Sequence, residues 1–251
     1  MREPPLKVSY SKVNTYQRCP LKYRLQYRDQ VPVEKPIVMH LGSAVHAALK
    51  LLHDPRNAAV PMLDAVVHEF DTQWQQLAAD RREYEARRDD GRAMLESYYA
   101  RLEQWRGRAV LAVEKWFSFV LDGAIEVVGF IDRIDRLPDD RIELVDYKTG
   151  RYLPSAHELK GDLQFAIYAL AAQQMYPGCT ARAQLYALQH DLGLRVDISA
   201  DDLTHAGATI RRTVTGIETE SFPARPGRQC DSCEYRPVCP YWAPVEAQAA
   251  E

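Results

Sequence analysis

The chain of 251 residues lacks a long hydrophobic run, and no stretch approaches the roughly 18 uncharged residues that a membrane helix needs. Its first ten residues, MREPPLKVSY, also lack the apolar core of a signal peptide. Internal repeats and low-complexity tracts are absent too. With 46% hydrophobic and 27% charged residues, the composition is that of an ordinary globular protein. We therefore expect a cytoplasmic location and no membrane partner.

Two further absences limit the function. The sequence contains no G-x-x-x-x-G-K-[ST] phosphate loop, so this chain is not expected to be an ATP-driven motor, and any unwinding would come from a partner. A strong positive charge is also missing, because the formal net charge is −3. This value argues against a continuous basic coat for nucleic acid, but it allows a local basic groove.

Cysteines are few, but four of the five lie beside proline or in a tight cluster. Cys19 precedes a proline, and the tail contains Cys230-x₂-Cys233-x₅-Cys239-Pro. In a chain expected in the cytoplasm, this spacing indicates metal ligation sooner than disulfides. Spacing alone allows both zinc and an iron–sulfur cluster, since tetrahedral sulfur sites suit either. Cys179 is left over, and we interpret it as a small apolar residue.

The hydrophobic pattern predicts a mainly helical part over residues 1–108. It includes one or two helices in SYSKVNTYQRCPLKYRLQY, a helix over 41–53, and a charged helical arm over about 62–107 with a mobile point around 89–91. From residue 109, three runs rich in β-branched and aromatic residues are separated by DG and PDD turn signals, which predicts antiparallel strands.

After these strands the pattern predicts an apolar helix over 162–176, strands near 181–189 and 193–199, and a helix over about 201–218. The segment 221–245 is rich in proline and cysteine and too irregular for a packed helix. We expect one α/β domain over 1–251, with its core in 109–220 and a central mixed sheet flanked by helices.

An acid and a lysine end the run IELVDYKTG. Asp146 and Lys148 occupy positions i and i+2 of a strand, so their side chains emerge on the same face. Asp132 ends the preceding strand, and a hairpin turn at LPDD would bring it close to Asp146. Two converging carboxylates repel each other, so a divalent cation is their natural companion, and hard oxygen ligands indicate Mg²⁺ or Mn²⁺. Such an ion polarises a phosphodiester, while a nearby lysine offsets developing charge.

Four other residues are candidates for this site. His46 lies on a small-residue helix that can approach the sheet, and it is a candidate third ligand. Glu114 interrupts an apolar strand, so it is either a solvent-facing position or an acid beside the metal. Gln164 and Tyr168 share one helix face at i and i+4, where their tips could meet a phosphate or a base edge.

In this order, GSAVHAAL, GFIDRID, VDYKTG and QFAIYAL resemble the RecB-type exonuclease branch of the PD-(D/E)XK nuclease superfamily. The resemblance covers about residues 8–242 and implies a restriction-endonuclease-like core. It also implies roles for the site residues: His46, Asp132 and Asp146 as ligands of the divalent metal, together with the backbone carbonyl of Tyr147; Lys148 as the catalytic lysine; Gln164 and Tyr168 as a DNA-engaging Q-x-x-x-Y element; and Glu114 as an acid of the first core strand.

The cysteine pattern is similar to that of the iron–sulfur branch of this family, which includes AddB. This resemblance implies a 4Fe–4S cluster held by Cys19, Cys230, Cys233 and Cys239, which would join the first helix to the C-terminal segment. Its role would be structural, because a link between residues about 210 positions apart restricts the unfolded chain.

The resemblance implies a Mg²⁺- or Mn²⁺-dependent deoxyribonuclease that hydrolyses phosphodiesters with a metal-activated water. It favours an exonuclease that acts on single-stranded DNA or DNA ends in repair or recombination, with a helicase as a potential partner. The alternative is a catalytically silent DNA-binding or scaffold component of a helicase–nuclease complex. The joint presence of His46, Asp132, Asp146 and Lys148 argues against a degenerate site.

Overall fold

The computed structural model describes residues 6–34, 36–75 and 81–242, so the last three residues of the predicted segment 221–245 lie outside it. The contacts within the chain divide it into two units. The first consists of Met1–Pro36, Val120–Val127 and Gly207–Glu251, and the second of Ile37–Phe119 and Val128–Ala206.

The strands form one mixed sheet with the order β1-β3-β4-β5-β6, in which β2 also pairs with β3. β4 runs parallel to β5, whereas the pairs β3–β4 and β5–β6 are antiparallel. The strands are β1 (Leu6–Ser9), β2 (Ala109–Leu121), β3 (Ile125–Arg136), β4 (Ile142–Lys148), β5 (Ala181–Ala187) and β6 (Leu192–Asp197).

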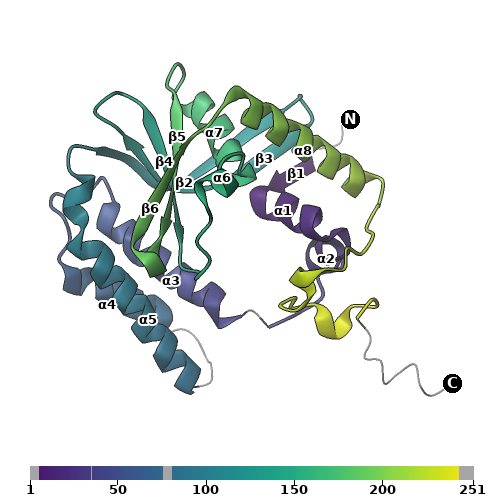
Figure 1. The fold of residues 1–251 in the computed structure, drawn as a ribbon, viewed down its shortest axis with the longest axis horizontal. Helices are drawn as coiled ribbons and strands as arrows, with labels where there is room; N and C mark the ends of the chain where they lie inside the picture. Colours follow the sequence, from purple (N-terminus) through teal and green to yellow (C-terminus); the bar gives the residue numbers. More distant parts are fainter. Residues whose placement is uncertain (1–5, 35, 76–80, 243–251) are drawn as a thin grey trace. The chain divides into compact units, whose positions relative to one another are not determined.

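Helices occupy the segments between and beside these strands (Figure 1). They are α1 (Tyr10–Arg18), α2 (Pro20–Tyr23), α3 (Ile37–His53), α4 (Leu63–Trp74), α5 (Arg81–Ala100), α6 (Ala156–Leu159), α7 (Leu163–Met175) and α8 (Ala200–Glu218). Single turns of tighter or wider helix are Arg24–Arg28, Leu102–Trp105, Leu188–His190, Arg228–Cys230 and Arg236–Val238. The predicted mixed sheet flanked by helices is confirmed.

Strand β4 separates two layers of the second unit. Val145 and Tyr147 face a core that α3, α4 and α5 supply, and Tyr186 of β5 belongs to the same core. The alternate residue Asp146 faces α7, whose Gln164 donates a hydrogen bond to it. Because neighbouring strand residues point to opposite faces, β4 places its apolar side chains in the helical core and its acid toward α7.

The predicted charged arm is part of this core. Helix α5 is continuous through Gly91, so the expected mobile point is not seen. A Cβ atom at Gly91 would lie 2.4 Å from the ring of Phe70 on α4, and glycine therefore permits the close approach of the two helices. The charges of the arm lie beside this contact, where Arg92 pairs with Asp71.

A buried cation supports β4 from behind the site. The side chain of Arg133 is 1% exposed, and its guanidinium donates to both oxygens of Asp135 at 2.7 and 2.6 Å. It also donates to the hydroxyls of Tyr98 and Tyr147 at 3.2 and 3.3 Å and lies 4.4 Å from the ring centre of Trp105. Buried charges need such complete pairing, and this network holds Tyr147 in place between the candidate residues Asp146 and Lys148.

In the first unit, the C-terminal segment is hydrogen-bonded to the N-terminal helices. The hydroxyl of Tyr16 donates to the carbonyl of Ser221 at 2.6 Å, and the backbone N–H of Leu21 donates to Pro223 at 3.3 Å. Lys22 also forms an ion pair with Glu234 at 2.8 Å. The two ends of the sequence are therefore neighbours within this unit.

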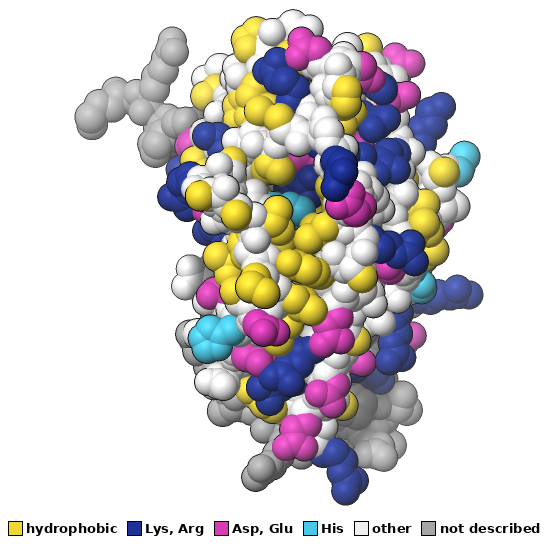
Figure 2. Space-filling view, turned by 90° about the vertical axis from the view of Figure 1, so that its left-hand side faces the viewer, with side chains coloured by type: hydrophobic (Ala, Val, Ile, Leu, Met, Phe, Trp, Pro, Cys, Tyr) yellow, Lys and Arg dark blue, Asp and Glu magenta, His cyan; other side chains and the backbone are white. Residues whose placement is uncertain are grey.

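Among the described residues, no helix is long and apolar enough to span a membrane. Figure 2 shows one face of the protein, on which Lys and Arg side chains alternate with Asp and Glu and a group of hydrophobic side chains lies across the middle. On this face there is no continuous basic coat, in agreement with the net charge of −3.

Candidate functional site

Three side chains from three elements of the second unit converge on one point. His46 of α3, Glu114 of β2 and Asp132 of β3 each offer a ligand atom, and these atoms lie within 4.8 Å of one another. Nδ1 of His46 is 3.6 Å from Oδ1 of Asp132 and 3.8 Å from Oε1 of Glu114. An imidazole and two carboxylates at this spacing form a donor set suited to a divalent cation.

Glu114 reaches this point through a local distortion of β2. Its φ of 44° lies in the left-handed region, which a glutamate rarely adopts in a strand. The distortion interrupts the alternation of β2, since the next two residues, Lys115 and Trp116, are both exposed. Backbone strain of this kind persists where the surroundings enforce it, often at functional sites. The acid that interrupts the apolar pattern in the sequence therefore points toward His46.

The hairpin of β3 and β4 brings the two predicted aspartates to the same end of the sheet. Arg133 lies opposite Val145, so Asp132 and Asp146 occupy the next position of the ladder. Oδ2 of Asp132 accepts a hydrogen bond from the backbone N–H of Tyr147 at 2.8 Å, which fixes the carboxylate at the end of β4.

Asp146 is linked to Lys148 and α7 rather than directly to the triad of His46, Glu114 and Asp132. Its Oδ2 lies 2.7 Å from Nζ of Lys148, and its Oδ1 accepts from Gln164 at 2.8 Å. Gln164 also accepts from Nζ of Lys148 at 3.1 Å and donates to the hydroxyl of Tyr168 at 2.7 Å. The amide therefore holds both the acid and the lysine.

The start of α7 fixes the position of Gln164. The side chain of Asp162 caps the helix by accepting hydrogen bonds from the N–H groups of Gln164 and Phe165 at 2.8 and 3.1 Å. An aspartate is among the strongest residues at this capping position. Gln164 and Tyr168 then follow one turn apart, as their spacing predicts.

The environment shifts two acid–base groups in the metal-free site. Burial alone would lower the pKa of His46, but hydrogen bonds with Asp132 and Glu114 outweigh it and raise that pKa to about 10. Burial raises the pKa of Asp146 to about 6, assisted by Asp132 and opposed by Lys148. Without a cation, the excess of carboxylates thus holds a proton on His46.

This proton predicts a pH-dependent affinity for metal. Because His46 ligates a cation only when neutral and its pKa is about 10, binding must displace the proton at neutral pH. We expect the affinity for Mn²⁺ to rise by up to about tenfold per pH unit between pH 6.5 and 8.5, with about one proton released per ion. Calorimetry in buffers of different ionisation enthalpy measures this release. A pH-independent affinity without proton release would contradict His46 as a ligand.

The local structure suits a hard divalent ion in two further respects. Oδ2 of Asp146 is buried and, apart from the ion pair with Lys148, has no hydrogen-bond partner among the described residues. An open pocket of about 480 Å³ lies beside the triad, lined by Met39, Gly42, Ser43, His46, Ala47 and Glu114. The backbone carbonyl of Tyr147, the other expected ligand, lies 3.0 Å from Nε2 of His46.

A second hollow shares Met39 with this pocket. It has a volume of about 330 Å³ and is lined by Val38, Met39, Leu41, Arg87, Thr149, Gly150, Arg151 and Gln189. Two arginines therefore lie along it, and Arg151 directly follows the predicted turn at Gly150. The two hollows together form a path beside the end of β4.

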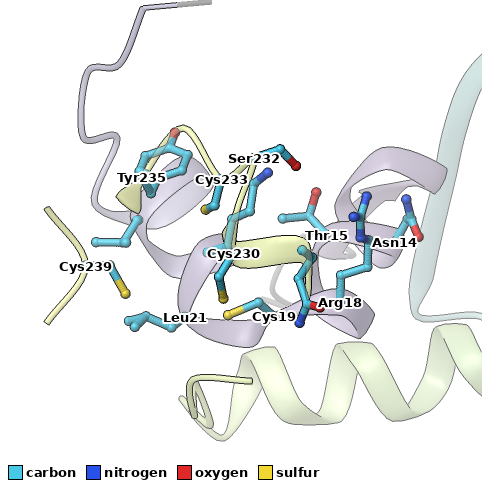
Figure 3. Close-up of a pocket in the computed structure, with 13 residues that line it drawn as sticks. Asn14, Thr15, Arg18, Cys19, Leu21, Cys230, Ser232, Cys233, Tyr235 and Cys239 are labelled. Atoms are coloured by element: carbon cyan, nitrogen blue, oxygen red, sulfur yellow. The ribbon is translucent and has the colours of Figure 1, made fainter. Parts of the chain in front are cut away.

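The four clustered cysteines line one pocket of about 150 Å³ in the first unit (Figure 3). Cys19 comes from the junction of α1 and α2, whereas Cys230, Cys233 and Cys239 come from the C-terminal turns. All are free thiols, and Cys179 does not line this pocket. The thiols are suitable donors for a metal group, but their sulfur atoms are not in cluster geometry, since in the described part of the chain only the His46 triad lies within 4.8 Å.

Comparison with known proteins shows similar sequences in two settings. The chain is 28% identical over 162 residues to one of the two kinds of chain that form the ATP-dependent helicase/deoxyribonuclease of Streptococcus agalactiae serotype Ia, over 59% of this chain but only 14% of that protein. It is 26% identical over 198 residues to the Gene 69 protein of Mycobacterium phage D29, over 67% of this chain and 69% of that protein.

A solved structure, the crystal structure of SSO0001, superimposes with a TM-score of 0.46 at 12% identity, over 97% of this chain and 90% of that one. The family model of the PD-(D/E)XK nuclease superfamily matches residues 7–240, nearly the full chain and both groups of candidate residues. With this match, the chain belongs to the PD-(D/E)XK nuclease superfamily.

Proposed function

We propose that the protein is a Mg²⁺- or Mn²⁺-dependent deoxyribonuclease, an exonuclease that acts on single-stranded DNA or DNA ends in repair or recombination. The observation that carries the proposal is the junction of the His46, Glu114 and Asp132 triad with the Asp146–Lys148–Gln164 network at one end of the sheet. A silent binding protein would have no need to keep a buried acid beside a lysine. The superfamily match supports the hydrolytic chemistry.

His46, Asp132 and Asp146 would hold the cation, with Glu114 completing the set beside His46. When bound, the cation supplies the Lewis acidity that polarises a phosphodiester and lowers the pKa of a water. Asp132 is held for this task by the N–H of Tyr147. This hydrogen bond favours the ionised carboxylate.

Lys148 would stabilise the negative charge that develops on the phosphate. Its Nζ is held by Asp146 and Gln164, so it is oriented before substrate binds. A preorganised charge of this kind costs little rearrangement in the transition state.

Tyr168 would serve as a donor to a substrate oxygen. Burial and the nearby carboxylates of Asp146 and Asp132 raise its pKa well above the usual value, so the hydroxyl keeps its proton. Its oxygen accepts from Gln164, and its own O–H group remains a donor. These two residues of α7 would therefore engage the phosphate backbone, as the Q-x-x-x-Y pattern suggests.

The test of the proposal is the effect of Lys148→Met. We expect the turnover of a single-stranded oligonucleotide with Mn²⁺ to fall at least about a hundredfold, because the loss of one preorganised charge costs about 3 kcal/mol. Mn²⁺ affinity should stay within a few-fold of wild type. Lys50→Met, at an exposed position of α3, is the matched control and should cut normally. Equal turnover in the two variants would refute the catalytic role.

The cysteine pocket is proposed to hold a 4Fe–4S cluster with a structural role. Four thiols from the two ends of the sequence face one pocket, and hydrogen bonds already join these segments. The relatives also support a helicase partner, because one of them is part of a helicase/deoxyribonuclease. The similar part is only 14% of that protein, so the motor would be supplied by a separate chain or domain.

A further inference from the structure

Two aromatic side chains are exposed beside the candidate metal site. Trp116 of β2 is 47% exposed and Phe130 of β3 is 51% exposed. Their ring centres lie 5.0 Å apart at an interplanar angle of 62°, an edge-to-face contact. Single exposed apolar residues are common, but a paired tryptophan and phenylalanine on adjacent strands form a local surface that calls for an explanation.

The neighbouring residues explain why the pair points outward. Phe117 is buried and packs over Gly129, where a Cβ atom would lie 2.7 Å from its ring. Phe117 also contacts Tyr168 edge-to-face at 6.0 Å. Because adjacent strand residues point to opposite faces, Trp116 and Phe130 project away from Phe117 and Gly129. The core is filled without the exposed pair, so packing does not account for it.

The pair is tied in position to the acids of the site. Trp116 follows Glu114 by two residues, and Phe130 precedes Asp132 by two residues. At the usual rise of a strand, each aromatic residue is about 7 Å along the backbone from its acid. A nucleotide whose phosphate lies at the triad therefore has a neighbouring base within reach of these rings.

We propose that Trp116 and Phe130 form a stacking platform for the unpaired bases of a single-stranded DNA substrate. This inference rests on the proposed function and specifies its substrate. Stacking on aromatic rings is open only to bases that are not already stacked and paired in a duplex, so the platform selects single strands.

The charge of the protein favours this occupant over a duplex. A chain with a net charge of −3 gains little from a general attraction to phosphates, so base stacking must supply a large share of its affinity. The exposed Lys115 lies between Glu114 and Trp116 and provides a local cation for the phosphate that links two stacked bases. Aromatic rings with an adjacent cation match the chemistry of a single strand.

The test is equilibrium binding of a fluorescent 12-residue oligothymidylate in Ca²⁺, followed by anisotropy. We expect Trp116→Ala to weaken binding about tenfold to a hundredfold, since stacking contributes about 1–3 kcal/mol per base. Trp116→Phe should retain most of the affinity. Leu192→Ala, which truncates an exposed apolar side chain on β6, is the control and should bind like wild type.

An abasic series separates stacking from a general structural effect. In oligothymidylates with one abasic residue at successive positions, wild-type binding should weaken at one or two positions, where Trp116→Ala should show no further loss. Equal binding by wild type and Trp116→Ala would overturn the platform. So would a loss that is independent of the abasic position, or a change of oligomeric state with DNA binding intact, which would assign the pair to self-association. A wild-type protein that neither binds nor cuts nucleic acid would instead refute the proposed function itself.

Discussion

Asp146→Asn is expected to reduce metal-dependent DNA cleavage by about a thousandfold or more, because it removes a charged ligand and the partner of Lys148. The same variant is expected to be more stable than wild type when no metal is present. A substitution that damaged the fold would lower both quantities, so opposite signs identify Asp146 as a residue kept for function.

The stability change follows from the buried charge. Burial raises the pKa of Asp146 from 3.8 to about 6, so its ionisation in the folded protein is unfavourable. The contribution of this group to stability is fully present below pH 3.8 and is lost as the pH rises through about 6. Asparagine avoids that loss, and at pH 7.5 we expect a gain on the order of 1–3 kcal/mol, or several degrees in melting temperature.

The measurement is thermal unfolding with chelator from pH 4 to 8, beside cleavage assays with Mn²⁺. The difference in melting temperature should be near zero at pH 4 and reach a plateau above about pH 7. Asp140→Asn, an exposed acid in the turn of the same hairpin, is the matched control and should change neither property. An Asp146→Asn variant that cuts at the wild-type rate would show that the site is wrongly assigned.

Cys233→Ser is expected to lower stability and iron content together. A cluster that joins Cys19 to the C-terminal cysteines closes a loop of about 210 residues, and the crosslink model gives about 4–5 kcal/mol for so long a loop. We therefore expect the melting temperature of anaerobically purified protein to fall by roughly 10 °C and the brown chromophore to be lost.

Cys179→Ser is the matched control, since Cys179 is also a free thiol but does not line the pocket. It should retain iron, colour and melting temperature. Metal analysis and visible absorption distinguish the outcomes. A Cys233→Ser protein with its full iron content, or a wild-type protein that contains zinc in place of iron, would contradict the cluster.

Local signals in the sequence account for much of the fold. The DG and PDD turns and the β-branched runs predicted β3 and β4, and the register of this hairpin followed from them. The apolar run around Gln164 predicted α7 nearly to the residue. In these segments, the hydrophobic period and the turn residues lie within a few positions of each other, so no distant contact is needed to interpret them.

Features that depend on distant contacts were not predictable in this way. The arm around Gly91 has a charged sequence, yet its packing against Phe70 is decided by a neighbouring helix. The pairing of Arg133 with Asp135, Tyr98 and Tyr147 likewise requires α5, β3 and β4 in place. In the sequence, Trp116 is one aromatic residue of a predicted strand, and only the distortion at Glu114 shows that it faces outward.

In the candidate site, Glu114 illustrates the same limit. Its position in an apolar strand was equally compatible with a solvent-facing acid, because the sequence carries no sign of a left-handed φ at a glutamate. The structure places it with His46 and Asp132, whereas Asp146 lies one step away beside Lys148 and Gln164.

The central claim is that this end of the sheet cuts DNA with a divalent ion. The most direct measurement is cleavage of end-labelled single-stranded and double-stranded DNA by the anaerobically purified protein, with Mg²⁺, Mn²⁺ or chelator. We predict that the single strand is shortened from an end in either metal, that duplex DNA is cut more slowly, and that chelator stops the reaction. A folded protein that cuts neither substrate in either metal would contradict the account.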